Sequence, residues 1–254
     1  PLKVLQKEKT WYLVQTPDQY IAWVDSAEII SLTIADLSKW KLAEKVIYLS
    51  DNGLIMSNPD KASRPVSDVV MGSILAVDNS EKNHGPYVAV LLPDGRKGYV
   101  DQQDCTNFLE WSQTVRPDTI AMMKRAFSLF GRPYLWGGTS SKAMDCSGFV
   151  KSIYQMSGMI LSRDASQQVN QGTEVPMKDI WRGLKAGDLL FFGRLATQKL
   201  PERVTHVGMY IGDSEFIHSS VMVKINSLDS TRTGYKPYYH THLLHVRRLI
   251  DTTN

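Results

Sequence analysis

The character of the sequence changes near residue 113, and this change constrains the fold more than any other feature. Before it, short β-branched and aromatic runs alternate with turns, as in "WYLVQTPDQYIAWV" and "YVAVLLPDGRKGYV". Many short strands with frequent turns are typical of small β-barrels. After it, segments with helical spacing come first and strand-like segments follow, which is typical of an α+β domain. We therefore expect separately packed parts.

A weak internal repeat divides the strand-rich part. The segments "TPDQYIAWVDSAE" and "LPDGRKGYVDQQD" each contain Pro-Asp, a turn, and an aromatic residue followed by Val-Asp. We interpret the repeat as two barrel modules. The expected boundaries are 1–42 for the first barrel, 43–112 for the second and 113–254 for the α+β domain. The first module looks short at its N-terminal side, so we expect an incomplete barrel behind a trimmed or processed terminus.

Composition narrows the class of protein. The 254 residues are 22% charged and 43% hydrophobic, which is typical of a soluble globular chain. A net charge of +3 without a Lys/Arg-rich block argues against nucleic-acid binding. No apolar run reaches the roughly 18 residues that a membrane helix needs. "WGGTSSK" lacks the spacing of a phosphate-binding loop, which argues against nucleotide binding.

Cys146 lies where a Gly-rich loop ends and the apolar, helix-like run "SGFVKSIYQM" begins. The first N–H groups of a helix have no intrahelical partners and carry partial positive charge. A thiolate there is stabilised, and its pKa can fall from about 8.5 toward 3.5–7.5. A buried structural cysteine is the alternative reading. Cys105, the other cysteine, is expected to be an ordinary half-buried thiol, because neither cysteine sits in a CxxC pair.

A reactive thiol needs a base, and "VTHVGMYIGDSEFIHSS" places His206 and His218 on neighbouring predicted strands. An odd-length loop centred on Gly212 would put the two histidines directly opposite each other, with Cβ atoms ~4.5–5.5 Å apart. A two-residue turn would send them to opposite faces. With the odd loop, Cys146, His206 and His218 form the nucleophile, base and orienting group of a cysteine hydrolase. The N–H of Cys146, aided by the Tyr134 hydroxyl, is the candidate oxyanion site.

The motifs "PYLWGG…DCSGFV", "RDASQQ", "GDLLFF", "THVGMYIG" and "FIHSS", in that order, are recognisable together. Through them, about residues 114–250 resemble the NlpC class of papain-like cysteine peptidases. The preceding part looks like two bacterial SH3-like barrels. This arrangement resembles the endopeptidases that hydrolyse the bond between γ-D-glutamate and a diamino acid in cell-wall peptides with a free N-terminal L-Ala. The resemblance implies a murein peptide as substrate and no cofactor or metal, and we expect a monomer.

The resemblance also implies roles for particular residues. It makes Cys146 the nucleophile, His206 the base and His218 the third member of the catalytic set. The positions that it places around the substrate pocket are Tyr134, Trp136, Asp145 and Ser147.

Asp164, in "RDASQQVNQG", can be interpreted in two ways. Asp-x-x-Gln is a capping-box pattern, with Asp164 as the N-cap and Gln167 reaching back. The resemblance implies in addition that this carboxylate faces the amino terminus of the substrate. It also implies that an aromatic residue of the first barrel, Tyr20 or Trp23, closes one side of the pocket.

Several alternatives stay open. "YYHTHLLH" contains a His-x-His pattern, which would put two imidazoles on one strand face for zinc, although no partnering Cys or carboxylate has diagnostic spacing. A general peptidoglycan endopeptidase and a non-catalytic wall-binding protein are the rival functions. A periplasmic or extracellular location is favoured, with cytoplasmic peptide recycling as the alternative.

Overall fold

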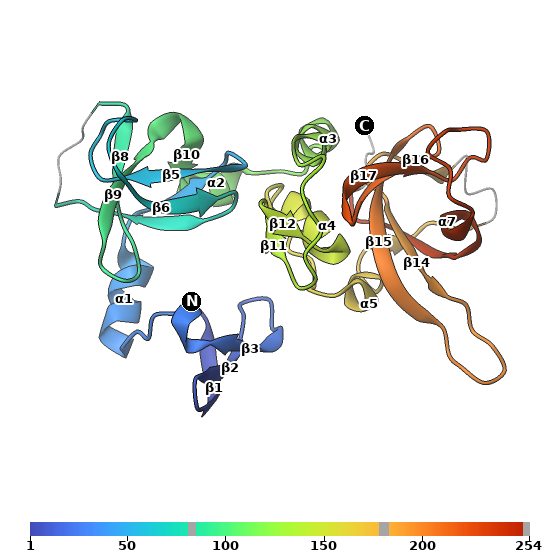
Figure 1. Ribbon diagram of the computed structural model, residues 1–254, viewed down its shortest axis with the longest axis horizontal. Helices are drawn as coiled ribbons and strands as arrows, with labels where there is room; N and C mark the ends of the chain where they lie inside the picture. Colours follow the sequence, from blue (N-terminus) through green and yellow to red (C-terminus); the bar gives the residue numbers. More distant parts are fainter. Residues whose placement is uncertain (81–84, 178–182, 251–254) are drawn as a thin grey trace. The chain divides into compact units, whose positions relative to one another are not determined.

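The computed structural model describes residues 1–80, 85–177 and 183–250 and contains two compact units, Pro1–Val115 and Arg116–Asn254 (Figure 1). None of the described helices is long and apolar enough to cross a membrane.

The first unit contains two antiparallel sheets. A three-stranded sheet has the order β1-β2-β3, and a seven-stranded sheet has the order β10-β4-β7-β8-β9-β5-β6. The strands of the first sheet are β1 (Lys3–Glu8), β2 (Trp11–Gln15) and β3 (Ile21–Asp25). Those of the second are β4 (Lys45–Tyr48), β5 (Asn52–Met56), β6 (Pro65–Val70), β7 (Ile74–Val77), β8 (Tyr87–Leu91), β9 (Lys97–Asp101) and β10 (Cys105–Asn107). The helices are α1 (Ile34–Leu42) and α2 (Phe108–Thr114).

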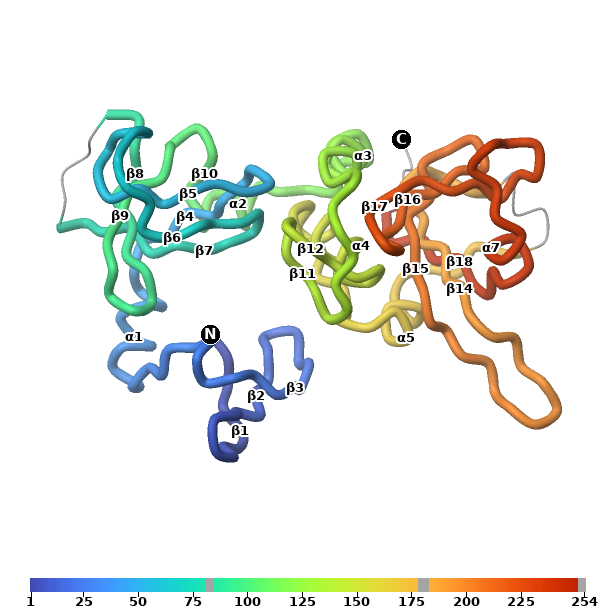
Figure 2. The backbone as a smooth tube through the Cα atoms, viewed as in Figure 1, coloured from blue at the N-terminus to red at the C-terminus, as the bar shows by residue number. Residues whose placement is uncertain are grey.

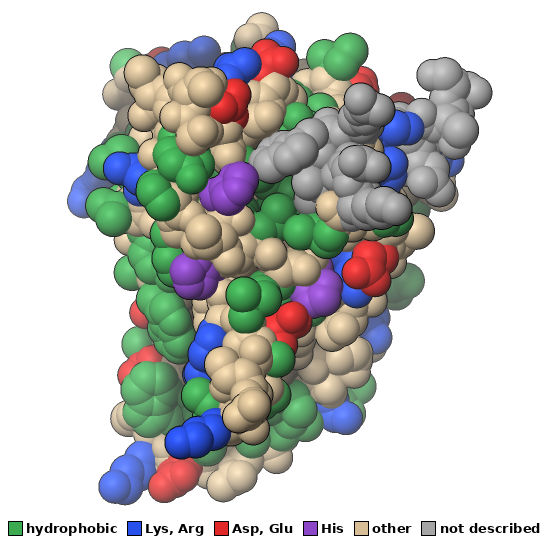
Figure 3. All heavy atoms as spheres, turned by 90° about the vertical axis from the view of Figure 1, so that its right-hand side faces the viewer, with side chains coloured by type: hydrophobic (Ala, Val, Ile, Leu, Met, Phe, Trp, Pro, Cys, Tyr) green, Lys and Arg blue, Asp and Glu red, His purple; other side chains and the backbone are tan. Residues whose placement is uncertain are grey.

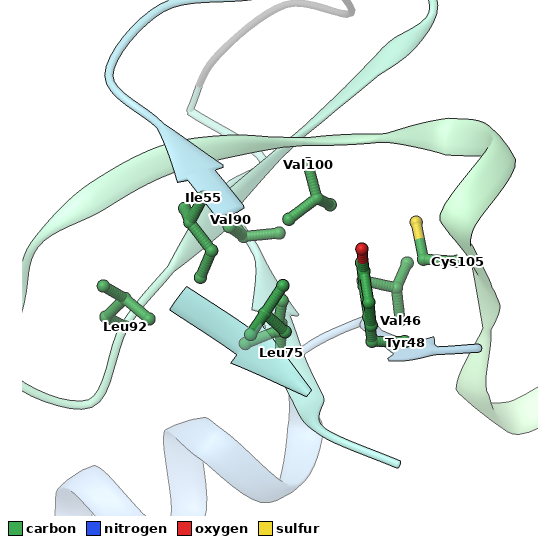
Figure 4. Packing of buried hydrophobic residues seen from close by; sticks show 9 residues of the cluster. Val46, Tyr48, Ile55, Leu75, Val90, Leu92, Val100 and Cys105 are labelled. Carbon is green, nitrogen blue, oxygen red and sulfur yellow. The ribbon is translucent and has the colours of Figure 1, made fainter. Parts of the chain in front are cut away.

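The seven-stranded sheet closes around its own hydrophobic core. Figure 4 shows side chains of this core, among them Ile55, Leu75 and Val90, gathered between the strands. Cys105 belongs to this core, and its pKa is raised to about 11, chiefly by burial. Cys105 is therefore buried and not half-buried as predicted, and both cysteines are free.

The internal repeat corresponds to the same local structure in both places. β3 ends at Asp25, whose carboxylate accepts the N–H of Ala27 at 2.9 Å and caps a short 3-10 helix. β9 ends at Asp101, which accepts the N–H of Gln103 at 3.0 Å in the same way. The Val-Asp of each repeat is therefore the end of a strand and the cap of a turn. The boundary between residues 42 and 43 and the SH3-like assignment stay predictions.

Helix α1 departs from the prediction of strands throughout residues 1–110. Thr33 accepts the N–H of Asp36 at 3.1 Å, and the Asp36 carboxylate accepts the N–H of Thr33 at 3.3 Å. This capping box begins a helix in which none of the residues is buried. The prediction of strands is therefore wrong for Ile34–Leu42, where a capping box begins a helix without a buried face.

The second unit packs helices against one large antiparallel sheet, as Figures 1 and 2 show. The six-stranded sheet has the order β13-β18-β14-β15-β16-β17. Its strands are β13 (Thr173–Glu174), β14 (Leu189–Arg194), β15 (Arg203–Gly212), β16 (Glu215–Ser220), β17 (Met222–Ser227) and β18 (Leu243–Arg248). A small hairpin joins β11 (Thr139–Ser140) to β12 (Ala143–Met144). The described helices are α3 (Thr119–Ser128), α4 (Cys146–Gln155), α5 (Ala165–Gln168) and α7 (Pro237–Thr241).

Both faces of this sheet are covered at β15, where four consecutive residues, Val207 to Tyr210, are buried. Tyr210 belongs to a core cluster with Phe192 and Phe216. Because side chains alternate along a strand, Val207 and Met209 face the other way. Helix α4 packs against β15 and β16. The α+β architecture of this part therefore agrees with the sequence prediction.

A close backbone approach fixes the start of α4. A Cβ atom added to Gly148 would overlap the carbonyl oxygen of Gly138 in the preceding loop. A side chain at 148 would therefore push that loop away from the helix.

We expect Gly148→Ala to lower the free energy of unfolding by about 1–3 kcal/mol, because the added methyl group must displace backbone atoms. Gly183→Ala is the matched control, since the nearest atom to its added Cβ is 3.6 Å away. Urea unfolding followed by circular dichroism measures both variants. Equal stability of the two would contradict the steric argument.

Candidate active site

Cys146 is the first residue of α4, as the sequence predicts. Asp145 is the N-cap, and its carboxylate accepts the N–H of Gly148 at 2.7 Å. Phe149, Val150 and other apolar residues of α4 are fully buried, so the helix is anchored along its whole length. The Cys146 side chain is therefore held at a fixed position at the helix start, and only 8% of the residue is exposed.

The Asp145 carboxylate is held by further hydrogen bonds and by an ion pair. It also accepts the N–H of Gly137 at 2.9 Å. Arg163 forms a bidentate ion pair with it, at 3.1 and 2.6 Å, and donates to the Ser147 hydroxyl at 3.0 Å. The side chains of both charged residues are about one-tenth exposed. The structure thus places Asp145 and Ser147 in the frame that holds Cys146, while their contact with substrate stays a prediction.

The protonation of Cys146 differs from the sequence prediction. Burial raises the pKa of the thiol, and the charge of Asp145 raises it further, although N–H groups of Val207, Ser147 and Cys146 itself act in the lowering direction. The predicted net fall in pKa from the helix start is therefore wrong for the resting site. The contact with the Val207 N–H places the sulfur beside the residue that follows His206.

His206 and His218 meet, but by a different register from the one predicted. Their Nε2 and Nδ1 atoms are 2.7 Å apart. The β15–β16 pairing joins Tyr210 to Phe216 and then shifts, so that Gly212 pairs with Glu215 around a two-residue turn. Asp213 and Ser214 in this turn both have positive φ. The predicted odd loop and direct opposition are therefore wrong.

A β-bulge at Ile211 reconciles the two-residue turn with histidines on one face. The register before the bulge pairs Met209 with Ile217, which places Gly208 opposite His218. A Cβ atom at Gly208 would lie 2.7 Å from Phe216 and 3.1 Å from the Cβ of His218. Because Gly208 has no side chain, the imidazole of His218 can lie across it and reach His206 diagonally.

Burial keeps both imidazoles neutral. It lowers the pKa of His206 to about 4, with a further contribution from the positive charge of Lys224. It lowers the pKa of His218 to about 3, where His206 and Lys224 add to the effect and the hydrogen bond with Asn226 opposes it. A neutral imidazole beside a protonated thiol can accept the thiol proton, so the arrangement is suited to nucleophilic attack by sulfur.

Tyr239 of α7 is a site residue that sequence reasoning missed. Its ring centroid lies 5.7 Å from that of His206 and 5.0 Å from that of His218. The pKa of Tyr239 is raised, chiefly by burial, and Cys146 contributes to the rise. Nothing in the local sequence "KPYYHTH" indicates that this residue packs against a strand more than twenty positions earlier.

The other predicted residues lie in different settings. Tyr134 is half-buried, and the nearby Cys146 and Asp145 add to the burial that raises its pKa. Trp136 is 86% exposed. Asp164 is the half-buried N-cap of α5, where the predicted capping box with Gln167 is present. Tyr20 is half-buried in the first unit, and its role toward the site stays a prediction.

The His-x-His segment does not form one strand face. His240 lies in α7 and His242 caps its end, whereas His245 lies in β18 and bonds Glu202 at 2.6 Å. Figure 3 shows histidine side chains reaching the surface at separate points. Among the described residues, no group of His, Cys, Asp and Glu is arranged to bind a metal ion.

The chain is similar to proteins of known family. Residues 131–248 match the model of the NlpC/P60 family. A gamma-D-glutamyl-L-lysine dipeptidyl-peptidase of Bacillus cereus is 36% identical over 130 residues, which are 51% of this chain and 37% of that protein. Dipeptidyl-peptidase 6 of Lysinibacillus sphaericus is 27% identical over 243 residues, covering 93% of this chain and 84% of the relative. The chain thus spans little more than a third of the first relative's length.

A solved structure has the same overall fold. The crystal structure of an NlpC/P60 family protein from Bacillus cereus superimposes with a TM-score of 0.78 at 26% identity, covering 97% of this chain and 78% of that one.

The lowered histidine pKa values predict a pH dependence of stability. Between pH 6.5 and about 4 the unfolded chain binds protons at residues 206 and 218 that the folded chain does not, so stability falls as the pH falls. We expect a loss on the order of 1 kcal/mol per pH unit for each histidine. Thermal unfolding between pH 7 and 5 should show this slope reduced in His218→Asn. A slope equal in the variant and the wild type would contradict it.

Proposed function

The chain belongs to the NlpC/P60 family, and from this premise we propose that it is a cysteine peptidase of cell-wall peptides. The bond that it hydrolyses joins γ-D-glutamate to a diamino acid, in peptides that begin with a free L-Ala. The relatives named for dipeptidyl-peptidase activity support this choice.

One observation carries the proposal, namely the convergence of Cys146, His206 and His218. The sulfur lies against the N–H of Val207, next to His206, and His206 bonds His218 at 2.7 Å. A wall-binding protein without catalysis has no need for a buried thiol and two buried neutral imidazoles in contact. Their burial costs free energy, which suits a site kept for chemistry.

The geometry supports hydrolysis in two steps. His206 takes the thiol proton as the sulfur attacks the γ-carbonyl carbon of the glutamyl residue. The N–H of Cys146 and the Tyr134 hydroxyl are the proposed donors to the oxyanion. The amide C–N bond then breaks, and His206 returns the proton to the leaving amine of the diamino acid. Water hydrolyses the thioester with His206 again as base, which releases L-Ala-D-Glu and the free thiol.

Asp164 is the proposed determinant of the free amino terminus. Its carboxylate accepts the backbone N–H of Gln167 in the capping box, and a carboxylate can accept further hydrogen bonds, here from an ammonium group. The neighbouring Arg163 is paired with Asp145. A carboxylate at this place would pair with a free α-ammonium and reject an acetylated or glycan-linked one. A general peptidoglycan endopeptidase would cleave both kinds of peptide.

We expect L-Ala-γ-D-Glu-meso-diaminopimelate to be cleaved and its N-acetylated form to be left intact. Cys146→Ala should lower kcat/KM by at least about 10³-fold, because the nucleophile is removed. Cys105→Ala, in the first unit, is the matched control and should keep the activity. Mass spectrometry of the products measures all three proteins. Cleavage of both peptides would favour the general endopeptidase, and cleavage of neither would favour the wall-binding protein.

Asp164→Asn should lower kcat/KM for the free peptide by about 10–100-fold, because a charge-assisted hydrogen bond becomes a neutral one. The preference for the free peptide over the N-acetylated one should therefore weaken. Gln167→Ala removes the other half of the capping box without changing charge, so it should keep the preference for a free amine. The role of Asp164 would be refuted by an undiminished preference in Asp164→Asn.

A further inference from the structure

We infer that Asn226 is a positioning residue that fixes the tautomers of both histidines, so that Nδ1 of His206 is the atom that accepts the thiol proton. The inference rests on the proposed function for the role of His206. The tautomers themselves follow from hydrogen bonds in the catalytic unit alone.

The Gly234 carbonyl determines how the Asn226 side chain is turned. The Nδ2 group of Asn226 donates to this oxygen at 2.8 Å, and Oδ1 faces Nε2 of His218 at 2.8 Å. The opposite orientation would bring two oxygen atoms, neither of which carries a hydrogen, to this separation. Asn226 is 5% exposed, so water cannot readily relieve such a conflict.

The orientation of the Asn226 amide then determines which ring nitrogen of His218 carries the hydrogen. Because Oδ1 of Asn226 can only accept, Nε2 of His218 must carry a hydrogen. In the neutral ring, which the low pKa requires, Nδ1 of His218 is consequently an acceptor. The atom facing it at 2.7 Å is Nε2 of His206, which must therefore donate.

The hydrogen bond between the rings also determines which nitrogen of His206 is basic. In neutral His206 the hydrogen sits on Nε2, so the basic lone pair sits on Nδ1. This ordering runs from the Gly234 carbonyl through Asn226 and His218 to the base. The titratable groups of other elements that act on the two rings or contact them are Lys224 from β17 and Tyr239 from α7, and the Cys146 thiol from α4 acts on Tyr239. None of them is a carboxylate, so an amide and not a charge orients the pair.

The backbone around Gly234 is itself fixed. Its carbonyl also accepts the N–H of Ser227 at 3.0 Å, and Ser227 forms a bridge with Tyr235. The segment that follows β17 is thereby tied back to the strand beside Asn226. This segment contributes no side chain to the proposed chemistry. The Gly234 carbonyl is nevertheless the first acceptor in the series of hydrogen bonds that leads through Asn226 and His218 to His206.

The test is the tautomer of each ring, read from two-bond ¹H–¹⁵N correlation spectra of histidine-labelled protein. Wild-type protein at pH 7 should show both His206 and His218 with the hydrogen on Nε2. Asn226→Ala should give a mixture at His218 and lower kcat/KM by about 10–100-fold, as loss of an orienting partner typically does. Ser227→Ala is the matched control, since it removes neighbouring part-buried hydrogen bonds and should keep wild-type tautomers.

Asn226→Asp provides a second variant of nearly the same shape. Its carboxylate would favour a charged histidine pair, so the acidic limb of the kcat/KM profile should move up by about 1–2 pH units. Nδ1–H at His206 in the wild type, or unchanged tautomers in Asn226→Ala, would overturn the inference. The spectra decide it even if no peptide is cleaved, so its failure is separate from failure of the proposed function.

Discussion

The ion pair between Asp145 and Arg163 holds the beginning of α4, and the arrangement of the site depends on it. One carboxylate caps the helix, ties down the Gly137 loop and neutralises a nearly buried guanidinium. Losing one partner of such a pair leaves an uncompensated buried charge, which is among the costliest single changes in a protein. The position of the Cys146 sulfur is therefore set by electrostatics at the helix cap as much as by packing along the helix.

The site combines this rigid helix start with the hydrogen-bonded side chains of His206, His218 and Asn226 on the sheet. Gly208 leaves room for His218, which bonds His206 at 2.7 Å, and the sulfur contacts the N–H of Val207, the next residue along the strand. Burial disfavours the charged forms of Cys146, His206 and His218, so these three side chains are neutral in the resting site. Charge is expected to appear only when the thiol transfers its proton, in surroundings where electrostatic stabilisation by fixed dipoles is strong.

Local patterns in the sequence were sufficient for some features and not for others. The Gly-rich loop and the apolar spacing of "SGFVKSIYQM" predict α4 and place Cys146 at its start. Helix α1 was not predicted, because strands and turns alternate around it and it has no buried face. Tyr239 and Asn226 could not be predicted, because their contacts depend on how distant strands and a short helix pack. The bulge at Ile211 is likewise absent from any local pattern, since it arises from the mismatch between turn and sheet.

Because of that bulge, an insertion or deletion in the β15–β16 hairpin has a different effect at the turn from its effect at Ile211. Residues added at the tip beside the exposed Asp213 lengthen the turn and keep the strand pairing that precedes the bulge. Deletion of Ile211 would instead shift the part of β15 before it by one residue relative to β16. Because side chains alternate between the faces of a sheet, His206 would then point to the opposite face. In related sequences, gaps should therefore gather at the tip and avoid the position of Ile211.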